Sequence, residues 1–220
     1  MSPAYWDGAY RTGHRIWGKR PSAVARAIGV FFEKGKIPTA GKRMLDVGCG
    51  YGRDALYLAD RWKVRTLGVD PSGQAIEMAQ AGLNEKTRRT EKFRQARFQD
   101  LTGETFDLVY AANLYQILPP EERTQFCDAV AGWLAPGGLL LLGTLSSRDP
   151  EHAGQGKEST LSLNSRETDL RLHLSTREEL ETAFHFLDIR GLFEHEFLEP
   201  RAEGRPHHHI AWILIGARKP

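Results

Sequence analysis

The sequence predicts an α/β fold: a doubly wound, Rossmann-like sheet with helices on both faces. Three observations predict this class. The apolar run 44–47 is followed by glycines at alternate positions and then by a helical pattern. A second apolar run, 67–69, ends in Asp70, about 20 residues after those glycines. Strand-like and helical segments then alternate toward the C-terminus, and this order builds a parallel sheet.

Local patterns define the elements of the first half. Apolar residues recur at helical spacing from Ala55 to Trp62, so a helix follows the glycine turn. Residues 64–70 and 93–98 have the pattern of strands. Between them Ser72 suits the N-cap of a helix over 72–84, because its hydroxyl can accept a hydrogen bond from the first turn.

The second half contains equally direct signals. A helix begins at Pro120, since proline suits the first helical position. Residues 138–144 form an apolar run typical of a strand buried on both faces. A capping box at 175–178 predicts the start of another helix. Residues 186–197 and 210–215 are then two consecutive strands, and the fully apolar second one is expected near the centre of the sheet.

Composition narrows the functional classes. The 220 residues suffice for one domain, or one domain with a cap, and the net charge of +2 gives no strong attraction to nucleic acid or membrane. We find neither a signal peptide nor an apolar run that could span a bilayer. Cys49 and Cys127 make no disulfide framework, so a cytoplasmic location is expected.

The glycine turn and Asp70 predict an adenosine-containing cofactor. Bare backbone at the turn lets a ligand approach the main chain, and an acid after the next strand can accept hydrogen bonds from a ribose diol. The spacing is G-x-G-x-G, with Gly52 one residue earlier than the third glycine of the dinucleotide fingerprint. This difference disfavours a nicotinamide oxidoreductase, which stays open as an alternative. There is no Walker phosphate loop.

Five markers in one order resemble class I S-adenosylmethionine-dependent methyltransferases. They are Asp46-x-Gly48-x-Gly50-x-Gly52, Asp70, and the segments 98–101, 106–113 and 133–140. The resemblance implies S-adenosyl-L-methionine as cofactor and a seven-stranded sheet whose last strand inserts antiparallel between the fifth and sixth. The cofactor-binding residues that it implies in this part of the chain are Asp46, Gly48, Cys49, Gly50, Gly52, Arg53, Asp70, Pro71, Asp100, Leu101 and Asn113.

Two segments lie outside this expected core. Residues 1–38 form an aromatic cap and a helix, and residues 39–220 form the methyltransferase domain. The stretch 6–17 resembles the leader of the tellurite-resistance and thiopurine methyltransferases. That resemblance implies that Trp6 and Tyr10 cover the cofactor and that Trp17 faces the substrate. Residues 145–174 are long for a connection, so we expect a lid-like insertion.

The acceptor is expected to be a small molecule. A sulfonium is already an excellent leaving group, so methyl transfer depends mainly on alignment in a dry pocket, and a soft sulfur, selenium or tellurium acceptor needs no base. If a base is used, His209 is the first candidate, and Tyr115 is a second catalytic candidate that could instead only line the pocket.

Two binding functions are disfavoured. His207 and His209 share one face of a strand, but no carboxylate or cysteine follows at a fixed spacing, so no metal is expected. The basic run from Lys86 to Arg97 is best explained as a solvated face, so no nucleic-acid partner is expected. A module that binds the cofactor without catalysis remains an alternative, and the sequence does not predict the oligomeric state.

Overall fold

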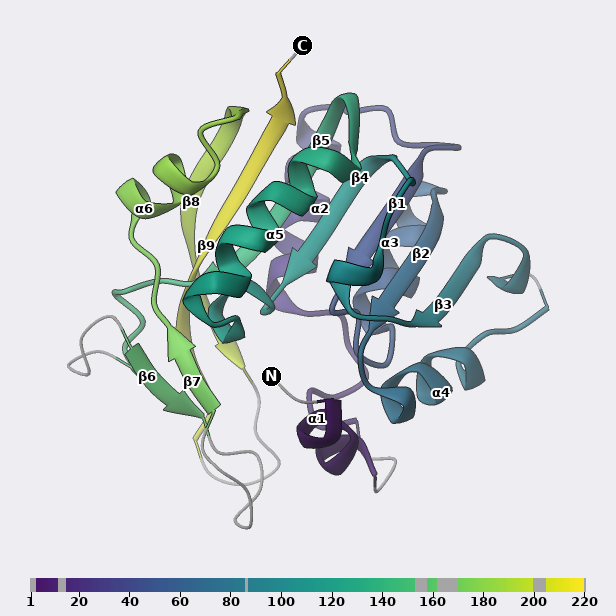
Figure 1. Cartoon of the computed structure of the whole chain (residues 1–220), viewed down its shortest axis with the longest axis horizontal. Helices are drawn as coiled ribbons and strands as arrows, with labels where there is room; N and C mark the ends of the chain where they lie inside the picture. Colours follow the sequence, from purple (N-terminus) through teal and green to yellow (C-terminus); the bar gives the residue numbers. More distant parts are fainter. Residues whose placement is uncertain are drawn as a thin grey trace.

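The computed structural model describes residues 3–11, 15–85, 87–152, 158–161, 170–199 and 205–219. Its centre is a seven-stranded sheet with the order β3-β2-β1-β4-β5-β9-β8 (Figure 1). β9 runs antiparallel to both of its neighbours, β5 and β8, and the other pairs are parallel. The predicted fold class is therefore confirmed, including the inserted last strand. The strands are β1 (Arg43–Val47), β2 (Arg65–Asp70), β3 (Glu91–Gln95), β4 (Phe106–Ala112), β5 (Leu134–Leu145), β8 (Leu187–Glu199) and β9 (His207–Arg218).

Helices cover both faces of this sheet. One apolar core lies between the sheet and α2 (Ala23–Lys34) and α3 (Arg53–Trp62), and it contains Ile28, Phe32 and Trp62. The other lies under α5 (Pro120–Trp133) and α6 (Arg177–Ala183), and it contains Phe126 and Phe184. α4 (Gly73–Ala81) packs on α3 and β3 through a smaller cluster. Burial on both faces explains the continuous apolar runs of β5 and β9.

The helix starts follow their predicted caps closely. The Ser72 hydroxyl accepts a hydrogen bond from Ala75 N at 3.1 Å, and α5 begins at Pro120. The capping residue of α6 is Thr176, whose hydroxyl accepts from Glu179 N at 3.2 Å. The capping box assigned to 175–178 was thus one residue early. Ser175 instead extends the edge of β5, where its N–H donates to Leu145 O.

Two strand boundaries also differ from the expectation. β3 ends at Gln95 and not at residue 98, the end of the predicted strand 93–98. Phe98–Asp100 forms a 3-10 turn instead. β5 begins at Leu134, before the predicted 138–144 run, and its first residue pairs with Phe106 across an irregular register. Both differences lie at the ends of strands, where the hydrophobic pattern does not mark the residue at which the strand gives way to its neighbouring turn.

The insertion 145–174 is partly described. β6 (Glu158–Leu161) and β7 (Leu170–His173) pair antiparallel as a separate two-stranded sheet; residues 153–157 and 162–169 lie outside the described ranges. Leu145, Leu172 and Leu174 pack with Tyr5 and other residues of the N-terminal region. The two-stranded sheet and α1 (Pro3–Tyr10) therefore both lie beyond the carboxyl ends of the parallel strands (Figure 1). No described helix is both long and apolar enough to cross a membrane.

Candidate cofactor and acceptor site

The turn between β1 and α3 forms the base of the site. Gly48, Gly50 and Gly52 have φ values of 72°, 52° and 75°, in the left-handed region that glycine adopts without strain. Gly48 N and Cys49 N both donate to Val69 O, at 2.8 and 3.0 Å. The turn is therefore fixed against the end of β2, which brings Asp70 beside it.

The three glycines have different neighbours, so the absence of a side chain has a different structural role at each position. A Cβ on Gly50 would lie 3.1 Å from the Tyr10 hydroxyl, and one on Gly48 would lie 3.2 Å from Leu114 Cδ1. A Cβ on Gly52 would lie 2.7 Å from Phe93 Cζ, inside the apolar cluster under α4. Gly48 and Gly50 border the space in front of the turn. Gly52 instead permits close packing of α3 and β3, which the glycine spacing alone could not distinguish from ligand contact.

Asp70 is a buried carboxylate at the end of β2. Its Oδ2 accepts a hydrogen bond from Gly50 N and its Oδ1 accepts one from Ser72 N, both at 2.9 Å. Burial raises the pKa of Asp70 to about 6, although these two backbone hydrogen bonds favour the ionised form. Each oxygen keeps a further lone pair. The group is thus held in place and can accept two more hydrogen bonds.

Asp46 is a second buried carboxylate, on β1 just before the turn. The side chain is 2 % exposed, and its Oδ2 has no hydrogen-bond partner among the described residues. Burial raises the pKa of Asp46 well above its ordinary value, and the charges of Asp54 and Asp70 add to this. An orphaned buried carboxylate oxygen is costly in an empty site. A cationic or hydrogen-bond-donating ligand group would satisfy it.

A cavity adjoins the turn, and its empty space is about 520 Å³ when the open solvent at its mouth is included. Its walls come from the ends of β1 and β2, the segment after β3 and the segment after β4, with Trp6 above. The lining is mostly apolar; the residues are Trp6, Val47, Gly48, Val69, Pro71, Ala96, Arg97, Phe98, Gln99, Leu114, Ile117, Leu118 and Glu122.

Asp100 and Leu101, two of the predicted cofactor residues, do not line this cavity. Asp100 is exposed, and its Oδ2 accepts from Arg97 N at 3.2 Å, which closes the 3-10 turn. Leu101 is buried in the core, and its carbonyl accepts from Trp133 Nε1 at 3.2 Å. The preceding residues Phe98 and Gln99 face the cavity instead. The predicted turn thus borders the cavity through Phe98 and Gln99, while Asp100 closes the turn itself.

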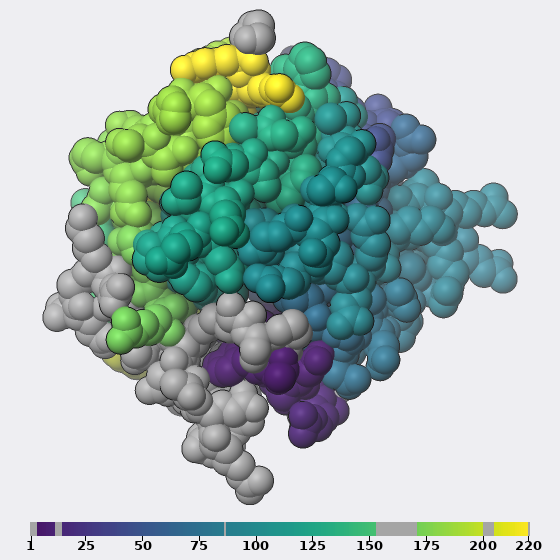
Figure 2. Space-filling model, viewed as in Figure 1, coloured from purple at the N-terminus to yellow at the C-terminus, as the bar shows by residue number. Residues whose placement is uncertain are grey.

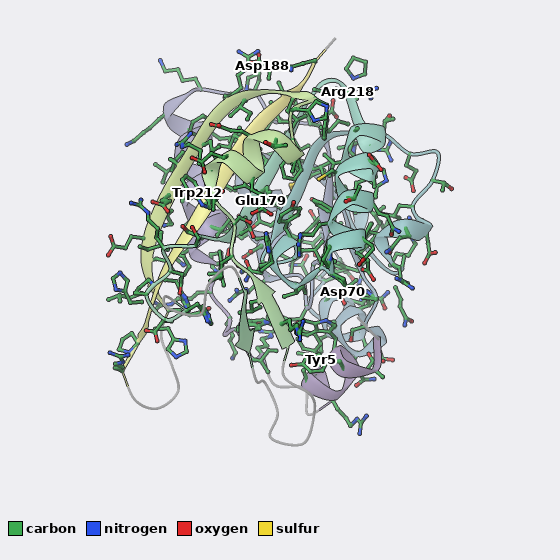
Figure 3. All side chains as sticks on the ribbon, turned by 60° about the vertical axis from the view of Figure 1, so that its left-hand side comes forward. Tyr5, Asp70, Glu179, Asp188, Trp212 and Arg218 are labelled. Carbon is green, nitrogen blue, oxygen red and sulfur yellow. The ribbon has the colours of Figure 1, made fainter. Side chains whose placement is uncertain are left out.

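The aromatic leader covers the glycine turn. Trp6 and Tyr10 on α1 stack with ring centroids 6.2 Å apart, and Tyr10 is 5 % exposed above Gly50. Trp17 packs in the same small cluster. Figure 2 shows α1 against the lower face of the body, and Figure 3 shows Asp70 just above the helix that carries Tyr5. Residues 12–14 of the leader lie outside the described ranges.

A residue that the sequence analysis missed, Asp7, fixes α1 in this position. Asp7 Oδ1 accepts hydrogen bonds from the Ser72 hydroxyl at 2.7 Å and from Gln74 N at 3.2 Å. The carboxylate thus lies at the N-terminus of α4, where the helix dipole favours negative charge. Asp7 follows Trp6 directly, but only the fold reveals that its hydrogen-bond partners, Ser72 and Gln74, lie 65 and 67 residues away in the sequence.

Arg53 anchors the leader instead of facing the cavity. Its guanidinium donates to Trp17 O and lies 3.9 Å from Asp54 Oδ1. The backbone N–H of Trp17 also donates to the Tyr51 hydroxyl at 3.1 Å. Cys49 is buried, with the pKa of its thiol raised by burial, and Asn113 is exposed with φ 60° at the end of β4.

Tyr115, a predicted catalytic residue, lies in the core. It is 3 % exposed and packs between Phe126 and Phe184. Burial raises its pKa far above the ordinary value for tyrosine. Tyr115 is not among the residues that line the cavity, and this placement assigns it to packing of the α5 face.

His209, the other predicted catalytic residue, lies at the start of β9 and pairs with a carboxylate that the sequence did not indicate. Its Nδ1 donates to Asp149 Oδ2 at 3.0 Å. Burial opposes a positive charge on His209, but the hydrogen bond and charge of Asp149 outweigh it and raise the pKa above the ordinary value. His209 does not line the cavity next to the glycine turn. The pair joins the end of β5 to the start of β9, 60 residues later.

Comparisons with known proteins agree with this geometry. Residues 44–138 match the family model described as a methyltransferase domain. The cyclopropane-fatty-acyl-phospholipid synthase of Escherichia coli (strain K12) is 30% identical over 150 residues, 67% of this chain and 35% of that protein. The ubiquinone biosynthesis O-methyltransferase of Brucella ovis is 28% identical over 199 residues, 86% of this chain and 79% of that protein. The chain thus spans about a third of the first relative and most of the second.

Solved structures share the fold at low sequence identity. The 1,6-didemethyltoxoflavin-N1-methyltransferase of Burkholderia thailandensis, solved with S-adenosylhomocysteine, has a TM-score of 0.70 at 17% identity; the match covers 99% of this chain and 87% of that one. TehB from Haemophilus influenzae has a TM-score of 0.65 at 14% identity over 88% of this chain and 62% of that one. These likenesses concern the fold and do not single out one subgroup.

S-adenosyl-L-methionine fits the residues of the site. Its ribose diol offers donors for the free lone pairs of Asp70, its ammonium would satisfy the orphaned oxygen of Asp46, and its adenine suits the apolar wall at Pro71 and Phe98. The chain therefore contains the catalytic domain of a class I S-adenosylmethionine-dependent methyltransferase, with S-adenosyl-L-methionine as its cofactor.

Proposed function

We propose that the protein transfers a methyl group from S-adenosyl-L-methionine to a small-molecule acceptor held between α1 and the insertion. The observation that carries this proposal is the pair of buried carboxylates, Asp46 and Asp70, on either side of the glycine turn. One of them has an orphaned oxygen and the other is fixed by backbone hydrogen bonds. Two buried acids in these states suit a ligand that carries both a cation and a diol.

The protein's own contribution is binding, alignment and exclusion of water. The cofactor supplies a sulfonium-bound methyl group that an acceptor can displace in line. Asp46 and Asp70 fix the two ends of the donor, while Trp6 and Tyr10 cover the glycine turn. Leu172 and Leu174 of the insertion pack with Trp6, so the cap and the insertion together close the site. A closed apolar site orients the reactants and keeps water out.

We further propose that the acceptor is a soft centre of the sulfur, selenium or tellurium type, methylated by proximity. The histidine that β7 of the insertion contributes, His173, is already paired with Glu179 through its Nε2. A soft anionic acceptor needs no proton removed in the transition state, so a position whose histidine is engaged by a carboxylate suits it. The aromatic leader supports placement near the tellurite-resistance and thiopurine methyltransferases.

An acceptor panel tests the proposal. The purified protein is incubated with S-adenosyl-L-methionine and separate thiols, selenite, tellurite, halides, catechols and amines, and release of S-adenosylhomocysteine is followed. We expect turnover with at least one soft acceptor and, at saturating S-adenosyl-L-methionine, a rate whose pH dependence follows ionisation of the acceptor alone. Turnover restricted to hydroxyl or amine acceptors would overturn the soft-acceptor assignment while retaining methyl transfer.

Two other functions make different predictions. A nicotinamide oxidoreductase would bind NAD(H) tightly and S-adenosylhomocysteine not at all in calorimetric titrations. A cofactor-binding module without catalysis would bind S-adenosylhomocysteine but release none across the whole panel.

For location, we propose a reducing cytoplasmic compartment, because Cys49 and Cys127 are both free thiols.

A further inference from the structure

Three potential metal ligands meet just beyond the end of β5, and none of the three is among the residues that line the cavity beside the glycine turn. Asp149 and His152 lie in the turn after β5, and His209 lies near the start of β9. One ligand atom from each lies within 4.8 Å of the other two. The side chains are also buried: Asp149 is 0 % exposed, His152 9 % and His209 8 %.

The carboxylate of this cluster is rigidly positioned. Asp149 Oδ2 accepts hydrogen bonds from Ile210 N at 2.8 Å and His209 Nδ1 at 3.0 Å, and Oδ1 accepts from Glu151 N at 3.1 Å. The rings of His152 and His209 are stacked, with centroids 6.0 Å apart and planes 21° apart. Two imidazoles and one carboxylate thus converge from two chain segments without large reorganisation.

We propose that Asp149, His152 and His209 bind one divalent transition-metal ion of the zinc type. Two imidazole nitrogens and one carboxylate oxygen suit zinc, iron or cobalt, whereas magnesium and calcium prefer oxygen donors alone. Atoms that are 3.0 Å apart, such as His209 Nδ1 and Asp149 Oδ2, can both reach an ion at about 2 Å. Three protein ligands leave at least one coordination position for water or a small ligand.

A fourth residue, Glu199, is placed as the carboxylate that often accepts a hydrogen bond from a metal-bound histidine. Glu199 Oε2, at the end of β8, lies 3.7 Å from His209 Nε2. A ligating histidine commonly donates its second N–H to a carboxylate, which fixes the ring orientation. The ion would therefore tie the start of the insertion to β9 and β8. This role is independent of methyl transfer, so the site can exist whatever the acceptor is.

The competing explanation is that Asp149 and His209 form only a buried hydrogen bond between β5 and β9. That explanation does not need the imidazole of His152, whereas ligation does. His152→Ala therefore separates the two explanations, and it leaves in place the hydrogen bonds that Asp149 accepts from His209 and Ile210. His208→Ala is the matched control, because His208 lies on the opposite face of β9 and bonds Glu196 instead.

The experiment uses the full chain without a polyhistidine tag, after chelator treatment and dialysis. Co²⁺ is titrated in and followed by its visible absorption, and Zn²⁺ then competes for the site. We expect one ion per chain, at least tenfold weaker binding in His152→Ala and Asp149→Asn, and unchanged binding in His208→Ala. Circular dichroism and thermal melting check that each variant is folded.

Three results would overturn the proposal: no stoichiometric Co²⁺ binding, equal binding in wild type and a folded His152→Ala variant, or loss of binding in His208→Ala. Zn²⁺ should also raise the melting temperature of the wild-type protein but not that of His152→Ala. Failure of the metal titration leaves methyl transfer untouched, because the acceptor panel tests that function separately.

Discussion

Replacing Asp70 with asparagine tests how the site holds the cofactor. Asp70→Asn keeps the shape of the side chain but removes its charge and one acceptor oxygen. Since Oδ1 and Oδ2 each accept a backbone N–H, one of Ser72 N or Gly50 N must then face an amide NH₂. A hydrogen bond to a charged group contributes about 1.5–3 kcal/mol, so affinity for S-adenosylhomocysteine at pH 7.5 should fall about 10- to 150-fold.

The pH dependence of binding gives a second signature of Asp70. Its pKa rises from 3.8 to about 6 in the free protein. This shift disfavours the buried ion by about 3 kcal/mol. The folded protein binds the proton more tightly than the unfolded chain, so this group lowers stability as pH rises from about 4 to 6, with the loss complete above pH 6. A ligand whose hydroxyls donate to the ionised carboxylate lowers that pKa again, so affinity should rise with pH through about 6.

Isothermal titration calorimetry with S-adenosylhomocysteine between pH 5.5 and 8 measures both effects. Wild type should bind more weakly below about pH 6, and the slope near that pH should be smaller in Asp70→Asn. Thermal melting is the control, because relief of the buried charge offsets the lost hydrogen bond and should keep the variant folded. Equal affinity of the two proteins at pH 7.5, or identical pH profiles, would refute the assigned role of Asp70.

Three further variants test neighbouring parts of the structure. Gly50→Ala should weaken S-adenosylhomocysteine binding at least tenfold in calorimetry, whereas Gly52→Ala, whose Cβ would meet Phe93, should mainly lower stability by about 1–3 kcal/mol; the reverse pattern would exchange their roles. Asp7→Ala removes the anchor of α1 and should weaken binding about fivefold to tenfold with little change in melting temperature, and unchanged binding would exclude α1 as a cover. Asp54→Ala leaves three buried donors without an acceptor, namely Ser22 N–H, the Ser22 hydroxyl and the Tyr110 hydroxyl. The free energy of unfolding in urea should therefore fall by about 3–5 kcal/mol, and a fall below about 1 kcal/mol would contradict the importance of these hydrogen bonds.

The fold could be predicted because its signals are local. The apolar run 210–215 indicated a central strand, and Ser72 and Pro120 marked helix starts correctly. The predicted N-cap of α6 lies one residue before the observed one, because Ser175 and Thr176 are chemically equivalent as N-caps. Ser175 is held by the edge of β5, and only the tertiary structure reveals that hydrogen bond.

The site was less predictable because its contacts join distant segments. The glycine pattern identified the turn, but Phe93 on another strand decides that Gly52 serves packing. Asp149 and His152 approach His209 only after β5 and β9 pair, so spacing along the chain gave no indication of the cluster. Asp100 is a cofactor residue only by the family resemblance of segment 98–101, and the 3-10 geometry turns its carboxylate toward Arg97 N.

The most direct measurement is a crystal structure of the protein with S-adenosylhomocysteine. We expect the ribose hydroxyls to contact Asp70, the amino group to contact the free oxygen of Asp46, and the Trp6–Tyr10 pair to cover the ligand. A ligand bound elsewhere, or hydroxyls that contact neither oxygen of Asp70, would contradict this expectation.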